Sequence, residues 1–404
     1  MKHATLKQFF LKQTPTGPRR GYQRSMSRPA DLPRIAPGLG AALGLALIAA
    51  PLAAWLSASL LRLGGLPAGA SPLSAIPVAV LLGLLVTNSL GGALPKLSLA
   101  LAPGLDWATK YALRLGVILI GVKLNALDVL RVGALGVPVV ITLVVLGLVS
   151  ARRFASWFGV SERLGLLAAA STAICGVTAT LAVAPAIEAD EREVAYTVAN
   201  VTLFGLLGMV FYPALAHALF DGNPGAAGLF LGAAIHDTSQ VMGAAIAYRE
   251  VYGDERVLQI ATVIKLTRNA LLVLVVPGLT WLYQRGRAQS PGAKSPSLLS
   301  LFPTFVLGFL LLSVVRTVGD WGLSEGGLAW GVTSAEGWRG LTKLLGEQAA
   351  TLALSTALAG VGLSTRLGTL SGLGLRPLAV GFGAALTVGL GALGLAAWIG
   401  AGLG

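Results

Sequence analysis

Long stretches without a charged residue are the feature that most restricts how this chain can fold. A transmembrane helix needs about 20 mostly apolar residues, because the hydrocarbon core is about 30 Å thick and a helix rises 1.5 Å per residue. The segment between Arg34 and Arg62 and the one between Arg131 and Arg152 meet this length without a charge. With windows that hold one or two ionisable groups, the chain has eleven candidate spans, at about 34–62, 62–96, 107–124, 131–152, 163–188, 193–221, 224–248, 255–283, 298–315, 342–365 and 376–404.

The composition agrees with this count of spans. Only 12% of the 404 residues are charged and 55% are hydrophobic, whereas an ordinary soluble domain has about 25% charged residues. Too few ionisable side chains are present to cover a water-facing surface, which excludes a soluble globular enzyme. We therefore predict an all-α polytopic membrane protein with about eleven transmembrane helices. Its one cysteine, Cys175, leaves no partner for an intrachain disulfide.

The placement of Lys and Arg predicts how the chain is oriented. Residues 1–35 carry eight Lys and Arg residues against one Asp and little aliphatic periodicity. This predicts a disordered cytoplasmic arm lying on anionic lipid headgroups, followed by a transmembrane transporter domain at 36–404. The Glu-rich loop at 188–193 would lie outside, and the loop containing Arg152, Arg153 and Arg163 would lie inside. The N-terminus is then inside and the C-terminus outside.

Two corners of the chain resemble each other, Gly121-Val-Lys-Leu-Asn125 and Gly360-Val-Gly-Leu-Ser364, and a glycine and a proline follow each at the same offset. They fall in the third and tenth spans, an odd number of crossings apart, so their orientations are opposite. Related units of opposite orientation are typical of secondary transporters, whose substrates bind near the midplane. We predict an inverted repeat, with a first unit at about 73–220 and a second at about 224–404. Chance similarity of two helix–loop–helix corners is the alternative.

The fifth span is rich in small and hydroxylated residues. Ala168, Thr172, Gly176 and Thr180 recur every four residues and share one helix face, which favours close helix packing. A second interpretation is a helix that breaks near Gly176, so that its freed N–H groups hold an anion. It predicts a discontinuous helix near 171–180 with the substrate-binding residues Ser171, Thr172, Cys175, Gly176 and Thr178.

Five consecutive polar residues, His236 to Gln240, interrupt the seventh span. A regular helix would show a polar group on every face, so we predict a discontinuous helix near 232–241, buried in the protein. A solvated loop between two short helices is the alternative. Because His236 changes charge near neutral pH and Asp237 binds a proton or a cation, both are candidates for ion coupling. Ser239 and Gln240 are candidates for substrate binding.

Lys265 and Arg268 lie three residues apart in the eighth span and therefore share one side of the helix. Charged residues at membrane depth usually face the protein interior and mark a transport pathway. We predict that both offset the charge of an anionic substrate. The alternative is that both side chains extend to the membrane surface.

Motifs of soluble or ATP-driven enzymes do not occur in the sequence. It contains no GxxxxGK[ST] or HExxH pattern, and only three histidines. We expect no enzymatic activity, no metal centre and no cofactor, apart from a coupling Na⁺ or H⁺.

Five motifs occur in order: Ser171–Gly176, Phe204–Pro213, Ala234–Val241, Val263–Arg268 and Gly362–Pro377. Together they resemble the YeiH family of bacterial inner-membrane proteins, described as sulfate exporters, over roughly residues 75–400. Where many relatives have Glu after the motif histidine, this chain has Asp237. The resemblance implies the fold of the sodium/proton-antiporter and bile-acid-transporter group. In that fold, crossed and broken helices form a core domain that moves against a scaffold or dimerisation domain.

We therefore expect a secondary active transporter of a small inorganic or sulfur-containing anion, such as sulfate or sulfite, coupled to protons or sodium. Its place would be the bacterial inner membrane, with a cytoplasmic N-terminus and a periplasmic C-terminus. Its partners would be the substrate, the lipid bilayer and a second copy of the chain, and not nucleic acid. Two alternatives stay open: a cation/proton antiporter with Asp237 as ion carrier and Lys265 as counter-charge, and a membrane sensor or scaffold that transports nothing.

Overall fold

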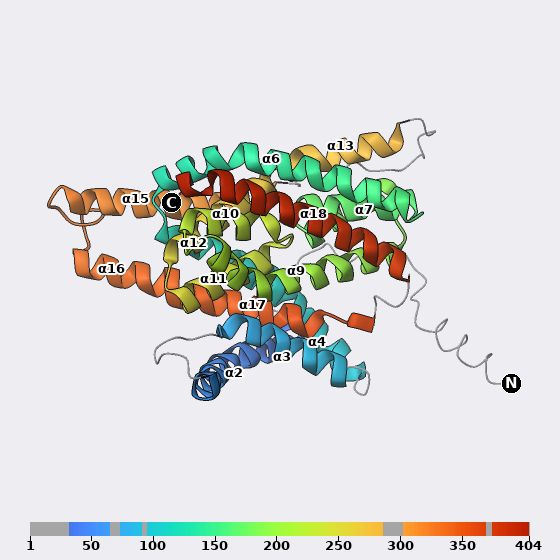
Figure 1. Cartoon of the computed structure of the whole chain (residues 1–404). Helices are drawn as coiled ribbons and strands as arrows, with labels where there is room; N and C mark the ends of the chain where they lie inside the picture. Colours follow the sequence, from blue (N-terminus) through green and yellow to red (C-terminus); the bar gives the residue numbers. More distant parts are fainter. Residues whose placement is uncertain (1–31, 65–72, 91–94, 286–301, 369–373, 404) are drawn as a thin grey trace.

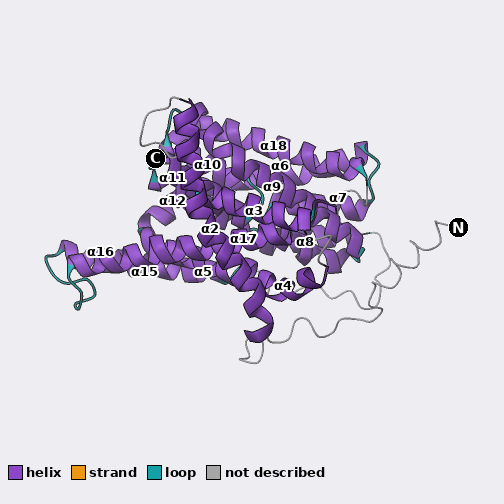
Figure 2. Ribbon diagram, turned by 90° about the horizontal axis from the view of Figure 1, so that it is seen from below, coloured by secondary structure: helices purple, strands orange, loops and turns teal. Residues whose placement is uncertain are grey.

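Helices make up nearly all of the structure, a computed structural model that describes residues 32–64, 73–90, 95–285, 302–368 and 374–403 (Figures 1 and 2). Most of the predicted basic arm therefore lies outside the described residues. Within these ranges the only β contact is one isolated bridge. The α-helices are α2 (Leu32–Gly64), α3 (Ala75–Leu90), α4 (Pro95–Trp107), α5 (Leu113–Ile120), α6 (Ala126–Trp157), α7 (Glu162–Ala173), α8 (Val177–Val183), α9 (Glu191–Leu219), α10 (Pro224–Ala234), α11 (Thr238–Tyr252), α12 (Glu255–Ala270), α13 (Leu272–Gln284), α15 (Phe305–Ser324), α16 (Ala335–Lys343), α17 (Ala350–Ser364) and α18 (Leu375–Ile399). Short 3₁₀ or π segments are η2 (Ala108–Ala112), η3 (Gly121–Lys123), η4 (Ala184–Ile187), η5 (Leu344–Ala349) and η7 (Gly400–Leu403).

The starts of several helices follow directly from local sequence. The Asn125 side chain accepts a hydrogen bond from the first turn of α6, and Ser161 does the same for α7. At the start of α9, Asp190 and Glu193 bond reciprocally to each other's backbone N–H groups. These caps satisfy the N–H groups that the first turn of a helix leaves unpaired. Each cap stands directly before an apolar stretch, so the helix boundaries are set locally.

In the part of the chain that the structure describes, seven helical segments are long and apolar enough to cross a membrane: Leu32–Ser59, Ala126–Trp157, Glu191–Leu219, Glu255–Gln284, Phe305–Ser324, Ala335–Ser364 and Leu375–Leu403. This confirms the prediction of an all-α, multi-pass membrane protein. The other four predicted windows fall on shorter or interrupted helices, namely α3, α5, the pair α7 and α8, and the pair α10 and α11. Eleven continuous spans are therefore not observed among the described residues.

Helices α7 and α8 form a hairpin that enters and leaves at the same end of the bundle. The Oγ of Ser161, at the start of α7, donates to Oε1 of Glu193 in the first turn of α9 at 2.7 Å. Helices α7 and α9 therefore begin side by side. Only residues 188–190 separate η4 from α9, so the chain must return to that same end. The hairpin turns at Gly176, whose Cα lies beside Val201 near the middle of α9.

Helices α10 and α11 form a second hairpin from the opposite end. The Nδ1 of His217, in the last turn of α9, is hydrogen-bonded to the hydroxyl of Tyr248 at 3.1 Å. Its ring also stacks on Tyr252 with centroids 3.8 Å apart. The C-terminal end of α11 thus lies beside the C-terminal end of α9. The short loop 220–223 leads from that end of α9 into α10. In Figure 1, α7 lies toward one end of the bundle and α10, α11 and α12 toward the other.

The hairpins correct the expected topology in two respects. The fifth and seventh windows are not crossings, and the pair of crossed, broken helices that the family resemblance implies is replaced by two hairpins whose turns meet. Residues 188–190 lie at the same end as Arg163, so the acidic loop is not on the opposite side from that arginine. The physical reason is length, because a hairpin of two half-helices needs as many apolar residues as one full crossing. Exchanging two crossings for two hairpins leaves the expected number of membrane crossings odd. The predicted orientations of the termini are therefore unaffected and stay predictions.

A separate group of helices packs beside the hairpins. One face of α2, with alanines at 42, 46, 49 and 53, packs on α3 and α4. Helix α17 packs on α2, α3 and α5, and also contacts α11. The second hairpin therefore lies against this group, whereas α7 and α8 pack mainly on α6, α9, α13 and α18.

The two corners that resemble each other in sequence differ in local structure, since Gly121–Lys123 is a 3₁₀ segment and Gly360–Ser364 belongs to α17, but the helices before them share one feature. A π-helical segment precedes each one, η2 before α5 and η5 before α17. The long helices that follow, α6 and α18, pack against each other in opposite directions, with Gly383 beside Phe154 and Gly391 beside Leu146. The extent of the inverted repeat, at about 73–220 and 224–404, stays a prediction.

Candidate functional site

Lys265 of α12 joins the turns of both hairpins. Its side chain is fully buried, and its Nζ donates to the carbonyl oxygens of Ile174 at 3.0 Å, Ile235 at 3.1 Å and His236. Three carbonyl acceptors require three N–H donors, which only the charged ammonium form provides. The first acceptor belongs to the first hairpin and the other two to the second. One cation thus holds both turns together.

Arg268, one turn further along α12, completes this arrangement. It is also fully buried, and its Nε and Nη1 donate to the carbonyls of Ala173 and Ala233, each at 2.7 Å. Its Nη2 donates to the carbonyl of Thr172. These are carbonyls at the C-terminal ends of α7 and α10, which a helix leaves unpaired and which carry partial negative charge. The two cations therefore make two interrupted helices possible at this depth.

Asp237 provides the negative charge at the same place. Its Oδ1 accepts hydrogen bonds from the backbone N of Ser239 at 2.9 Å and from the Ser239 hydroxyl, which caps the start of α11. Gly176 in the other turn has φ +51° and ψ −106°, a conformation that suits glycine. A Cβ on Gly176 would lie 3.4 Å from Oδ2 of Asp237. The two turns are therefore in contact through a glycine and a carboxylate.

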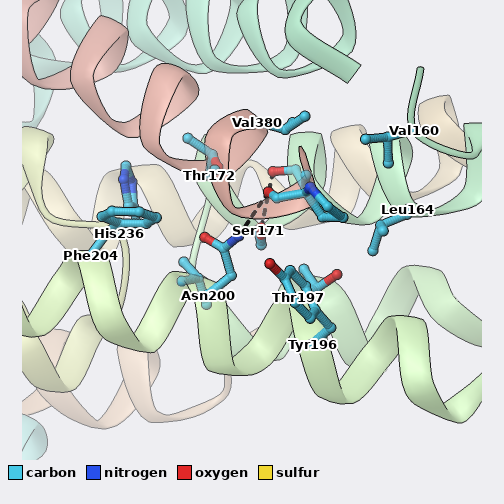
Figure 3. Close-up of a pocket in the computed structure, with 14 residues that line it drawn as sticks. Val160, Leu164, Ser171, Thr172, Tyr196, Thr197, Asn200, Phe204, His236 and Val380 are labelled. Carbon is cyan, nitrogen blue, oxygen red and sulfur yellow. Dashed lines mark hydrogen bonds between the residues drawn. The ribbon is translucent and has the colours of Figure 1, made fainter. Parts of the chain in front are cut away.

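A pocket lies beside this junction, between α7, α9 and α18 (Figure 3). Its polar lining residues from the helices are Ser171, Thr172, Tyr196, Thr197 and Asn200. His236, from the turn of the second hairpin, lines one end. It is 3% exposed, and its Nδ1 has no hydrogen-bond partner among the described residues. A buried, unpaired ring nitrogen at the end of a pocket is available to a ligand.

The structure brings together most of the predicted site residues. Ser171 and Thr172 lie at the end of α7, and Cys175 and Gly176 lie in the turn of the first hairpin. His236 and Asp237 lie in the turn of the second hairpin, Ser239 lies at the start of α11, and Lys265 and Arg268 of α12 lie between the two turns. The side chains of two other predicted residues are placed differently. Thr178, two residues after Gly176, is exposed on α8. The Gln240 amide donates to the carbonyl of Thr202 at 3.0 Å, and its oxygen packs against Gly205, so this side chain holds the second hairpin on α9.

Three polar residues of the pocket, Tyr196, Thr197 and Asn200 of α9, were not expected from the sequence. The Tyr196 hydroxyl donates to the carbonyl of Gly374 at 2.9 Å, and Asn200 Nδ2 donates to the carbonyl of Pro377 at 3.0 Å. Their spacing of three and four residues in an apolar span was the available signal, because it puts polar groups on one helix face.

The fold and the site define a multi-pass membrane protein in which two hairpins from opposite ends meet at buried cations. The chain belongs to the family described as Conserved hypothetical protein 698, which matches it over residues 41–381. It is 34% identical to the UPF0324 membrane protein TauZ of Paracoccus pantotrophus over 283 residues, 69% of this chain and 76% of that protein. A UPF0324 membrane protein of Fusobacterium nucleatum is 28% identical over 72% of this chain and 83% of its own length. Another, from Bordetella bronchiseptica, is 32% identical over 65% and 80%. This membership is consistent with the resemblance to the YeiH family, and no solved structure matches the chain.

Proposed function

We propose that this protein is a secondary active transporter of a small inorganic or sulfur-containing anion, such as sulfate or sulfite. We place it in the bacterial inner membrane with the N-terminus in the cytoplasm and the C-terminus in the periplasm, and we expect coupling to protons or sodium. The observation that carries the proposal is the meeting of two hairpin turns from opposite ends at Lys265 and Arg268. No enzymatic step and no cofactor is part of it.

Hairpins from opposite ends suit alternating access. Non-helical backbone at membrane depth is tolerated where it is buried in protein or lines a water-filled cavity. Each turn here is held by side chains of α12 rather than by its own helix. A small movement of one hairpin would therefore open the junction toward one side while the other hairpin keeps it closed toward the other.

The charge at the junction favours an anion. Lys265 and Arg268 contribute two positive charges and Asp237 one negative charge, so these side chains have a net charge of about +1 when His236 is neutral. The partial charges of the helix ends roughly cancel, because two C-termini and two N-termini meet here. A monoanion about 6 Å from one uncompensated charge gains roughly 3 kcal/mol at an effective dielectric constant of about 20. A cation would be repelled by the same amount, which disfavours the cation antiporter.

The residues of the junction divide into three roles. Ser171, Thr172, Cys175 and Gly176 line the first turn and offer hydroxyl and backbone groups to the substrate. Lys265 supplies charge without a free donor in this conformation, because all three of its N–H groups bind carbonyls. His236 and Asp237, which can exchange a proton or a cation, are the proposed coupling residues. The direct substrate contacts expected for Ser239, Gln240 and Thr178 stay predictions.

Reconstituted vesicles test the proposal. Purified protein in liposomes should exchange radiolabelled sulfate or sulfite, and the Lys265→Ala and His236→Ala variants should lower this flux at least about tenfold, equivalent to 1.4 kcal/mol. Lys123→Ala is the matched control, because Lys123 pairs with Glu255 and Glu347 away from the junction. Wild-type flux in both junction variants would refute the site. Sodium-driven proton movement without anion exchange would instead identify a cation antiporter.

A further inference from the structure

The pocket is elongated and runs from one end of the bundle to the hairpin junction. On α7 it is lined from Leu164 to Thr172, and on α9 from Tyr196 to Phe204. Eight residues of helix correspond to about 12 Å. Figure 3 shows Val160 and Leu164 at one end of the pocket and His236 at the other, with Ser171, Thr197 and Asn200 between them.

The two ends of this pocket differ in position. Val160 belongs to the connection before α7, at the base of the first hairpin. His236 belongs to the turn of the second hairpin, which enters from the opposite end. The pocket therefore connects the end that carries Arg163 and Arg376 with the junction, and the second hairpin closes it there.

The pocket wall is mostly apolar and carries no charged side chain. None of its lining residues is Asp, Glu, Lys or Arg, whereas hydroxyl groups of Ser171, Thr197 and Tyr196 and the amide of Asn200 belong to it. The hydroxyl groups of Ser171, Tyr196 and Thr197 and one N–H group of the Asn200 amide donate to backbone carbonyls. The charged side chains of Lys265, Arg268 and Asp237 lie at the junction. The anionic nature of the solute is therefore inferred from the charge at the junction and not from the wall.

Asn200 sets the width of the pocket at its middle. A Cβ at Gly381 of α18 would lie 2.0 Å from the Oδ1 of Asn200 and 2.6 Å from its Nδ2. The amide thus occupies the space that any side chain at Gly381 would need. One of its N–H groups holds the carbonyl of Pro377, which keeps the amide on the wall of the pocket.

We infer that the pocket between α7, α9 and α18 is the passage through which a small anion reaches the hairpin junction from the end that carries Arg376, with Asn200 and Gly381 as its selective constriction. The inference rests on the proposed function for the identity of the solute. The passage itself is a geometric claim about these helices, and it can be tested without measuring transport.

Thiol labelling tests the passage, because the chain has one native cysteine, the buried Cys175. Asn200→Cys and Thr197→Cys are placed singly in the full-length protein and treated in vesicles with the anionic reagent sulfonatoethyl methanethiosulfonate. Arg376→Cys and Arg256→Cys mark the two faces. The wild-type protein is the control for reaction of the reagent with Cys175. Leu207→Cys, on the exposed face of α9, is the control for reagent that arrives through the lipid.

The expected result is labelling of both pocket cysteines from the face marked by Arg376→Cys, at least about tenfold faster than with the trimethylammonium reagent, as a net positive site requires. Sulfate at millimolar concentration should slow this reaction, whereas Leu207→Cys stays unlabelled. Labelling from the opposite face, or no labelling of either cysteine in folded protein, would overturn the passage. Equal rates for the anionic and cationic reagents would overturn its selectivity.

A plug variant separates this inference from the proposed function. Gly381→Val should abolish labelling of Thr172→Cys from the Arg376 face, because the new side chain displaces the Asn200 amide into the passage. Gly394→Val is the matched control on the same helix, since a Cβ there meets open space. If no tested anion is transported but the plug blocks labelling, the proposed function fails and the passage stands. If anions are transported and Gly381→Val leaves both flux and labelling unchanged, the passage fails and the junction stands.

Discussion

Replacing Lys265 by methionine measures how strongly the hairpin turns depend on one ammonium group. Methionine has nearly the same length and volume, so packing changes little. The three carbonyls of Ile174, Ile235 and His236 lose their donor in a fully buried position. Leaving a buried acceptor unsatisfied costs about 1–3 kcal/mol. Taking the lower value for each carbonyl, because water can partly replace the ammonium group, we expect a loss of about 3 kcal/mol in the free energy of unfolding.

The assay is equilibrium unfolding of purified protein in mixed micelles, with Lys123→Met as control. Lys123 forms its ion pairs with Glu255 and Glu347, which are 32% and 45% exposed. Pairs of this kind contribute about 1 kcal/mol or less. If Lys265→Met is no less stable than Lys123→Met, the carbonyls at the ends of α7 and α10 do not depend on this side chain. The proposed construction of the junction would then be wrong.

Three further variants have defined outcomes. Gly176→Ala should lower the unfolding free energy by about 2 kcal/mol, because φ +51° with ψ −106° is strained for alanine. The control Gly253→Ala, with φ +76° and open space around it, should lower it by about 1 kcal/mol. Thermal denaturation compares the two variants. Asp237→Asn can still cap α11 through its amide oxygen, so stability should hold while the dependence of flux on a proton or sodium gradient disappears. Gln240→Leu removes the bond to the carbonyl of Thr202 and leaves that backbone group buried, so a loss of about 1–2 kcal/mol is expected; a variant as stable as wild type would show that this contact does not hold the second hairpin.

The two interruptions were predictable because each has a local cause. A run from His236 to Gln240 cannot lie on one helix face, and Gly176 follows a segment of small residues that permits a turn. Lys265 and Arg268 were also predictable as buried groups, because charge at membrane depth must face protein. What the sequence could not show is that their partners are backbone carbonyls. Backbone atoms are present at every residue and leave no signal in composition or spacing.

The pocket is a second feature that could not be predicted from the sequence. Asn200 is an ordinary polar residue in the sequence, and its importance depends on Gly381, which is 181 positions away along the chain. The missing side chain of one residue and the amide of the other meet only when α9 and α18 pack together.

The sequence by itself determined that the chain is a helical membrane protein, where several of its helices begin, and that two of its apolar segments are interrupted. These properties depend on composition and on neighbours within a few residues. Only the tertiary structure decided that each interrupted segment turns back as a hairpin, that α12 joins the two turns, and that a pocket leads to them. Those outcomes depend on which distant segments pack together, because a half-helix of given length satisfies its own hydrogen bonds equally well in either direction.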